Sequence, residues 1–148
     1  CRSRALLAFQ EPSFIRRYLA ENDMPRRTSR TVTDRARLRR IVDEVRRSGV
    51  VVTQGEHTVG AGAVAAPVIE RDGRGRHAIG IGVPIDRLEP RRELLAALVV
   101  EAARQVSWTL GGHAASPVHA THKPLENTVS SVAAAPSTRP TKARQGER

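Results

Sequence analysis

The sequence predicts an α+β domain in which helices cover an antiparallel sheet. Apolar residues recur at helical spacing up to about residue 48, and helical spacing returns after Pro90. Between these segments, short β-branched runs alternate with turn residues, and Asp72-Gly73 separates two of the runs. Strands that follow one another through short turns pair antiparallel, which favours α+β over a parallel α/β fold.

The first helices are expected to be short. Arg4 to Phe9 has the composition of a helix end, with leucines and a phenylalanine available for burial. Pro12 suits the first turn of a second helix over Ser13 to Asn22, which carries apolar residues at helical spacing.

The segment from Asp34 to Ser48 is the most regular helix in the sequence. Its apolar residues follow the i, i+3, i+4, i+7 pattern of one buried face. Thr33 is the expected N-cap, Asp34 favours the positive helix start, and Gly49 is the expected left-handed C-cap. The buried stripe consists of Leu38, Ile41, Val42 and Val45.

Three strands and a closing helix are expected next. The strands are Val50 to Thr53, Ala63 to Glu70 and His77 to Pro84, and the third alternates Ile or Val with glycine. A long helix then runs from Pro90 to about Leu110 with a broad apolar face. These elements place the folded domain at residues 1–111.

Residues 112–148 are predicted to form a disordered basic tail rich in Pro, Ser and Ala. From residue 113 onward this segment holds five Lys or Arg and two Glu, and almost no large apolar residue. Such a composition buries too little apolar surface to offset the entropy lost on ordering.

Composition and charge exclude several classes of protein. A chain of 148 residues allows one domain of ordinary size, and its one cysteine excludes a disulfide framework. No apolar run approaches the roughly 18 residues of a membrane span. The first residue is Cys1 and no signal peptide follows, so we expect a cytoplasmic piece whose true beginning is missing.

The sequence contains no catalytic constellation, and neither a metal nor a cofactor is expected. Glu56-His57 has no nucleophile at a motif spacing, which favours a polar loop over a metal-dependent enzyme built on this pair and His77. Separately, three histidines of the predicted tail could reach one metal ion, but that segment lacks the fixed geometry of a metal site. These are His113, His119 and His122.

Gly80 and Gly82 lie inside a strand, so they do not form a dinucleotide-binding fingerprint. Alternating glycines in a strand mark the close approach of a ligand or of another part of the backbone. The sequence leaves both alternatives open: the wall of a cavity, or close packing of a helix on the sheet.

The net charge of +10 raises the alternative of direct, non-specific nucleic-acid binding through the arginine-rich helix and the tail. Aromatic platforms and a helix-turn-helix pair are absent from the sequence around these arginines, and most of them fall on the outward helix face. A solvated surface is therefore the preferred interpretation. The run comprises Arg26, Arg27, Arg30, Arg35, Arg37, Arg39, Arg40, Arg46 and Arg47.

Six motifs in order resemble the effector-binding domain of IclR-type bacterial transcription regulators, over about residues 1–111. Residues 1–8 (CRSRALLA) are similar to the family's G-[KR]-A-L-L-A helix, and Thr31-x-Thr33 with the following helix is similar to its T-x-T segment. Residues 54–60 (QGEHTVG) resemble its E-E-x-x-x-G-V stretch. The later matches are residues 63–68 (AVAAPV), Asp72-Gly73, and residues 79–84 before the closing helix.

The resemblance implies a GAF-like or profilin-like fold, incomplete at its N-terminus, that binds a small effector and is not an enzyme. In the family, a winged helix-turn-helix domain binds the promoter. This chain lacks that domain, so we expect it to contact DNA only through a missing N-terminal part. The resemblance further implies a homodimer or tetramer in the intact protein, with no membrane partner.

Carried over by position, the resemblance implies an effector site on the sheet beneath the first helix. This sequence has small residues where family members that bind small carboxylates place hydrogen-bonding side chains, which favours a bulkier ligand such as an aromatic acid. Two glycines are expected to widen the cavity, and Ser3 partly restores a donor. The implied ligand-binding residues are Ser3, Thr53, Gln54, Ala63, Gly80 and Gly82.

Overall fold

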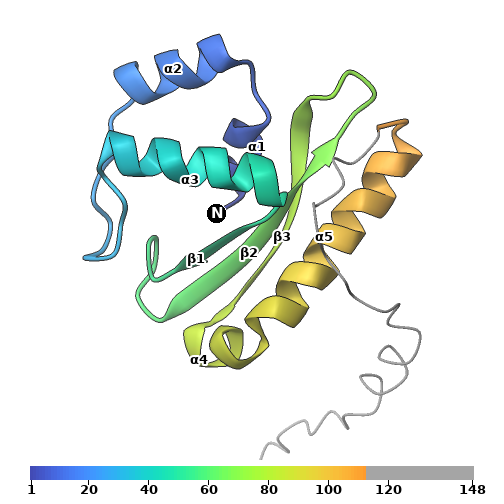
Figure 1. Ribbon diagram of the computed structural model, residues 1–148. Coiled ribbons are helices and arrows are strands. Elements are labelled where there is room, and N and C mark those ends of the chain that lie inside the picture. The colour runs from blue at the N-terminus through green and yellow to red at the C-terminus, as the bar shows by residue number, and fades with distance from the viewer. Residues whose placement is uncertain (113–148) are drawn as a thin grey trace, which may run out of the picture. The chain divides into compact units, whose positions relative to one another are not determined.

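The computed structural model describes residues 1–112 and confirms the predicted α+β architecture (Figure 1). The predicted tail lies outside the described residues from residue 113 onward. In chain order the elements are α1 (Arg2–Ala8), α2 (Pro12–Glu21), α3 (Arg35–Ser48), β1 (Val51–Gln54), β2 (Ala61–Ile69), β3 (Gly75–Pro84), α4 (Ile85–Leu88), a 3-10 turn (Glu89–Arg91) and α5 (Arg92–Thr109).

The three strands form one antiparallel sheet in the order β1-β2-β3. Helices cover both faces, with α1 and α3 on one side and α5 on the other (Figure 1). Each face has its own apolar core, because side chains alternate between the two faces along each strand. Val51 and Ala65 belong to the core beneath α1 and α3, whereas Val64 and Val68 belong to the core beneath α5.

The third helix, α3, has the boundaries that its stripe predicts, but its N-cap differs from the prediction. Asp34, not Thr33, is the N-cap, and its carboxylate accepts a hydrogen bond from the backbone N–H of Arg37 at 2.6 Å. A carboxylate there also interacts favourably with the positive end of the helix dipole. Gly49 takes the expected left-handed conformation, with φ of 72°.

The closing helix begins at Arg92 instead of Pro90, because the 3-10 turn (Glu89–Arg91) takes up the predicted start, and a separate short helix, α4, precedes that turn. Leu88 of α4 is fully buried and packs over Gly62 of β2, where a side chain would overlap it. A single glycine in β2 therefore makes room for an element that the sequence pattern does not reveal. In the described part of the chain, no helix has the length and apolar character needed to span a membrane.

Ser107 joins α5 to the sheet at a strand irregularity. The β2–β3 register shifts between Val68 and Ile69, and the backbone N–H of Ile69 donates to Ser107 Oγ at 2.8 Å. Ser107 Oγ in turn donates to the carbonyl of Ala103 at 2.7 Å, and this serine is fully buried.

We predict that Ser107→Ala lowers the free energy of unfolding by about 1–2 kcal/mol, because it leaves the buried N–H of Ile69 without its acceptor. Urea unfolding measures this change. Thr109→Ala is the matched control, since Thr109 makes the same i−4 bond on the exposed side of α5. Equal effects of the two substitutions would contradict the role given to Ser107.

Candidate functional site

Three of the six predicted ligand-binding residues lie side by side across the sheet. Thr53 pairs with Ala63, and Ala63 pairs with Gly82 on its other side. We call these three residues the cross-strand row. Gly80 lies two positions along β3 on the same face, opposite Ala65. This register brings four small residues from three strands into one continuous strip.

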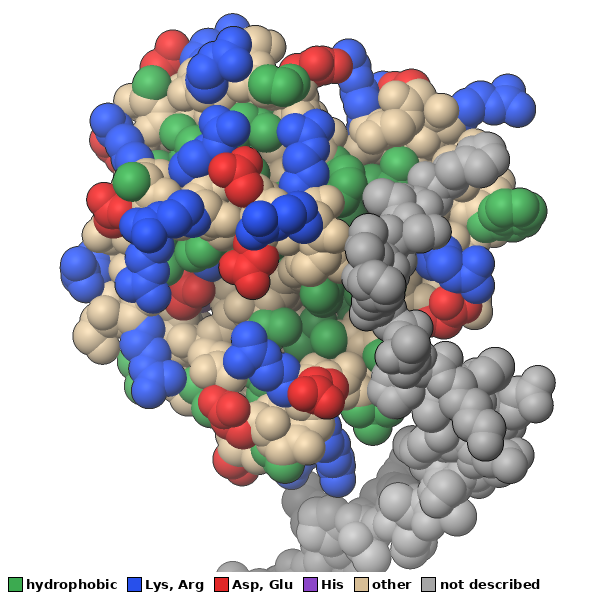
Figure 2. All heavy atoms as spheres, viewed as in Figure 1, with side chains coloured by type: hydrophobic (Ala, Val, Ile, Leu, Met, Phe, Trp, Pro, Cys, Tyr) green, Lys and Arg blue, Asp and Glu red, His purple; other side chains and the backbone are tan. Residues whose placement is uncertain are grey.

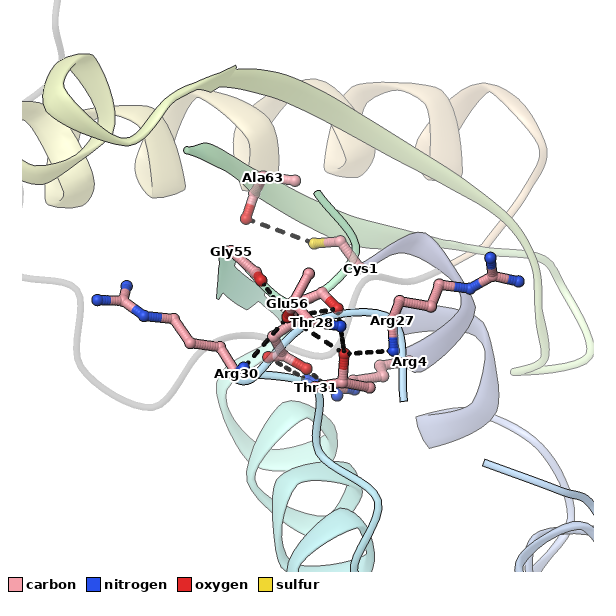
Figure 3. Close-up of polar contacts among 9 residues, drawn as sticks. All are labelled: Cys1, Arg4, Arg27, Thr28, Arg30, Thr31, Gly55, Glu56 and Ala63. Carbon is pink, nitrogen blue, oxygen red and sulfur yellow. Dashed lines mark hydrogen bonds and ion pairs between the residues drawn. The ribbon is translucent and has the colours of Figure 1, made fainter. Parts of the chain in front are cut away.

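The start of α1 lies above the cross-strand row. The Cys1 thiol is 3.4 Å from the carbonyl oxygen of Val51 and 3.5 Å from that of Ala63 (Figure 3). Ala5 and Ala8 are fully buried, and these small residues let α1 pack closely on the sheet. Thr53 and Ala63 are half-buried and Gly82 is exposed, so the row opens to solvent at β3.

The two glycines of β3 that were predicted to bind the ligand, Gly80 and Gly82, differ in the space around them. A Cβ at Gly80 would lie 2.9 Å from Ala65 Cβ and 2.9 Å from the Val64 carbonyl oxygen. Gly80 is therefore a site of close packing and not the wall of a cavity. A Cβ at Gly82 would meet only the Gly62 carbonyl oxygen, at 3.9 Å. Of the two positions, only Gly82 adds open space to the row.

The remaining two predicted residues lie apart from the row. Ser3 is in the first turn of α1 and is exposed to solvent. Gln54 follows Thr53 in β1, and alternation places its side chain on the opposite side of the strand. There it lines a separate cleft with several arginines.

A pair of threonine hydroxyls holds the loop before α3 against the end of β1. Thr28 Oγ1 donates to the Gly55 carbonyl at 2.6 Å, and Thr31 Oγ1 donates to the Glu56 carbonyl at 2.6 Å (Figure 3). Thr31 Oγ1 also accepts from the backbone N–H of Thr28 at 2.9 Å. The T-x-T motif singled out Thr31 in the sequence, whereas no sequence pattern singled out Thr28.

We expect Thr31→Val to lower the free energy of unfolding by about 1–2 kcal/mol, because the isosteric valine leaves the Thr28 N–H and the Glu56 carbonyl without this partner. Thermal unfolding and hydrogen exchange of the 26–33 backbone measure the effect. Thr33→Val is the control, since Thr33 Oγ1 makes only a 3.4 Å contact with exposed Arg26. Unchanged exchange in Thr31→Val would show that this hydroxyl does not hold the loop.

Arg4 and Glu56 form a two-pronged ion pair beside the row (Figure 3). The side chains are only 15% and 19% exposed, so the pair is largely withdrawn from water. It connects α1 to the turn after β1. The pairing was not foreseen from the sequence, because residues 52 positions apart gave no spacing signal.

The same pair bears on the alternative of a metal-dependent enzyme. Glu56 binds Arg4, while His57 is exposed in the β1–β2 turn and His77 pairs with Val68 near the other end of β2. Within residues 1–112, no three potential metal ligands cluster. The three histidines considered above, from His113 onward, lie outside the described residues.

The arginines of α3 face solvent, as the preferred interpretation expects. Figure 2 shows basic side chains spread over the face that carries α2 and α3, with acidic side chains between them. One basic and one acidic side chain of α3, Arg39 and Asp43, form an ion pair one helical turn apart, with 3.1 Å between Arg39 Nε and Asp43 Oδ2. The alternative of nucleic-acid binding gains no support from this mixed surface.

The comparisons with known proteins agree with this architecture. The family "Bacterial transcriptional regulator IclR C-terminal" matches residues 2–108. The regulator BhcR of Paracoccus denitrificans is 32% identical over 106 residues, which cover 71% of this chain and 38% of BhcR. KdgR of Escherichia coli is 30% identical over 111 residues, covering 74% of this chain and 42% of KdgR.

Solved structures show the same fold. The C-terminal domain of E. coli KdgR superimposes with a TM-score of 0.68 at 29% identity, covering 74% of this chain and 68% of that one. A putative regulator from Rhodococcus sp. RHA1 gives a TM-score of 0.70 at 29% identity, covering 74% and 46%. The fold is thus that of an α+β domain found in bacterial transcriptional regulators.

The chain belongs to the family of IclR C-terminal domains, as its motif order indicated. It spans about two fifths of the length of the curated relatives named above. Those relatives carry the names of transcriptional regulators.

Proposed function

We propose that this domain is the ligand-sensing part of an IclR-type DNA-binding regulator and has no enzymatic activity. The observation that carries this proposal is the cross-strand row of Thr53, Ala63 and Gly82, which lies beneath the start of α1 at Ala63 and opens to solvent at Gly82. Its membership of a family of transcriptional regulators supports a regulatory role.

The proposed ligand is a small organic acid, with aromatic acids as the leading class. The Arg4 guanidinium at the start of α1 lies beside the row, and a carboxylate is the group with which it pairs in this structure. The row supplies one hydroxyl, from Thr53, and otherwise small apolar surface. A ring would fill the space at Gly82 without requiring hydrogen bonds that the row cannot make.

The proposed mechanism is a shift between two arrangements of an oligomer. An effector that binds one arrangement more tightly changes its population, and thereby the promoter occupancy of an attached helix-turn-helix domain. We propose a cytoplasmic homodimer or tetramer for the whole protein. The ion pair between Arg4 and Glu56 lies beside the row, where it would respond to a bound carboxylate.

A thermal-shift screen of benzoates and short aliphatic carboxylates on the full-length regulator tests this function. We expect at least one acid to raise the melting temperature saturably and to change operator affinity in a gel-shift or anisotropy assay. If no acid raises the melting temperature and none changes the operator affinity, the proposed function is wrong.

A further inference from the structure

A second concave site lies beside β1, where Val52 and Gln54 point to the α5 face of the sheet, away from the cross-strand row. It is a cleft of about 650 Å³, a volume typical of small-molecule sites. Its walls are the loop before α3, the first turn of α3, this side of β1 and the start of α5. We call it the arginine cleft, because its lining includes Arg26, Arg30, Arg37 and Arg92.

The arginine cleft carries excess positive charge, because its four arginines outnumber its two carboxylates, Asp34 and Glu56. Asp34 caps α3 by accepting from the backbone N–H of Arg37, and Glu56 is held by Arg4. Among the described residues, none of the four cleft arginines forms an ion pair. These guanidinium groups come from segments far apart in the sequence.

Gln54 supplies a second, independent observation at the same place. Its side chain lines the cleft, and its amide Nε2 is buried with no hydrogen-bond partner among the described residues. A buried donor without an acceptor is unfavourable, and a rotation of the Gln54 side chain toward an acceptor oxygen in the cleft would relieve this cost. The cleft therefore combines excess positive charge with an unsatisfied donor.

We propose that the arginine cleft binds a small polyanion, a molecule bearing two or more carboxylate or phosphate groups. Guanidinium forks match the geometry of both groups, and arginines on opposite walls require more than one acidic group for full engagement. The site is separate from the proposed effector site, because Val52 and Gln54 face the cleft while Thr53 faces the row. It does not depend on the proposed function.

The geometry favours a small ligand over a nucleic acid. Arg30 passes its side chain over the left-handed turn at Gly55, whose φ is +66°, and extends away from the Cys1–Ala63 contact (Figure 3). Arg92 lies at the start of α5, on another wall of the same hollow. A duplex requires basic groups along an extended outward surface, whereas these four exposed arginines surround one hollow.

Isothermal titration of the protein with citrate and with pyrophosphate tests the proposal, at constant ionic strength set by NaCl. We expect saturable binding with one site per chain for at least one of these probes. Arg30→Gln/Arg37→Gln should weaken it roughly tenfold or more, because two charge-assisted contacts are lost. Arg40→Gln/Arg47→Gln removes the same charge from two α3 positions that do not line the cleft, and it should leave binding within roughly twofold of wild type.

Two further measurements separate the cleft from a general charge effect. The side-chain amide signals of Gln54 should shift on titration in wild type, and not in the Arg30→Gln/Arg37→Gln variant. A short random-sequence DNA duplex is titrated in parallel. Its affinity should fall no further in Arg30→Gln/Arg37→Gln than in the control variant Arg40→Gln/Arg47→Gln. The proposal is overturned by absence of saturable binding, by equal losses in both variants, or by an unmoved Gln54 amide.

Discussion

Gly80→Val should lower the free energy of unfolding by about 3 kcal/mol. A Cβ at this position would lie 2.9 Å from both the Val64 carbonyl oxygen and Ala65 Cβ, and 3.3 Å from Arg2 Cγ. The neighbouring strand backbone would have to move, and overpacking of this kind costs about 1–3 kcal/mol or more. Urea unfolding followed by circular dichroism measures the change.

The matched variant is Gly82→Val, on the same strand and the same face. Its Cβ would meet only one atom, at 3.9 Å, and valine favours the strand conformation over glycine. We therefore expect a change within about 0.5 kcal/mol, or slight stabilisation. Equal losses at both positions would show that Gly82 is packed and that the row has no free space.

Glu56→Gln should lower the free energy of unfolding by about 2 kcal/mol, the second-largest expected effect. The substitution keeps the shape of the side chain but leaves the Arg4 guanidinium, whose side chain is 15% exposed, without its carboxylate. Thermal and urea unfolding both report the loss. Arg4→Met introduced together with Glu56→Gln should recover part of it, because no uncompensated charge then remains.

Glu101→Gln is the control for this ion pair. Glu101 binds Arg104 one turn along α5, but these side chains are 48% and 52% exposed. Exposed pairs contribute little, so the control should stay within about 0.5 kcal/mol of wild type. If Glu56→Gln behaves like this control, the Arg4–Glu56 pair is not what fixes the start of α1.

The helices and strands were predictable because each has a periodic apolar pattern. Leu38, Val42 and Val45 are buried, and Gly49 ends α3 in the expected left-handed conformation. The N-cap was misassigned because Thr33 and Asp34 are adjacent and both side chains can cap a helix. The short helix α4 was missed because the burial of Leu88 depends on other elements, namely Gly62 of β2 and the core beneath α5.

The candidate site was only partly predictable, because cross-strand register is a tertiary property. The motifs named Thr53, Ala63 and Gly82 individually, but only the pairing shows that they are neighbours. The alternation of β1 separates Gln54 from Thr53, a distinction that the sequence motif does not make. Arg4 and Glu56 have no sequence relation at all, since their contact depends on how α1 lies on the sheet.

The central claim is that an organic acid binds on the cross-strand row, and a titration series at Gly82 tests it most directly. The best-stabilising acid of the carboxylate screen is titrated into wild type, Gly82→Ala and Gly82→Leu by calorimetry. Leucine fills the open space at Gly82, so we predict that Gly82→Leu weakens binding roughly tenfold or more while its unfolding stays near wild type. Gly82→Ala should bind nearly as wild type does. Wild-type affinity in a folded Gly82→Leu variant would contradict the account.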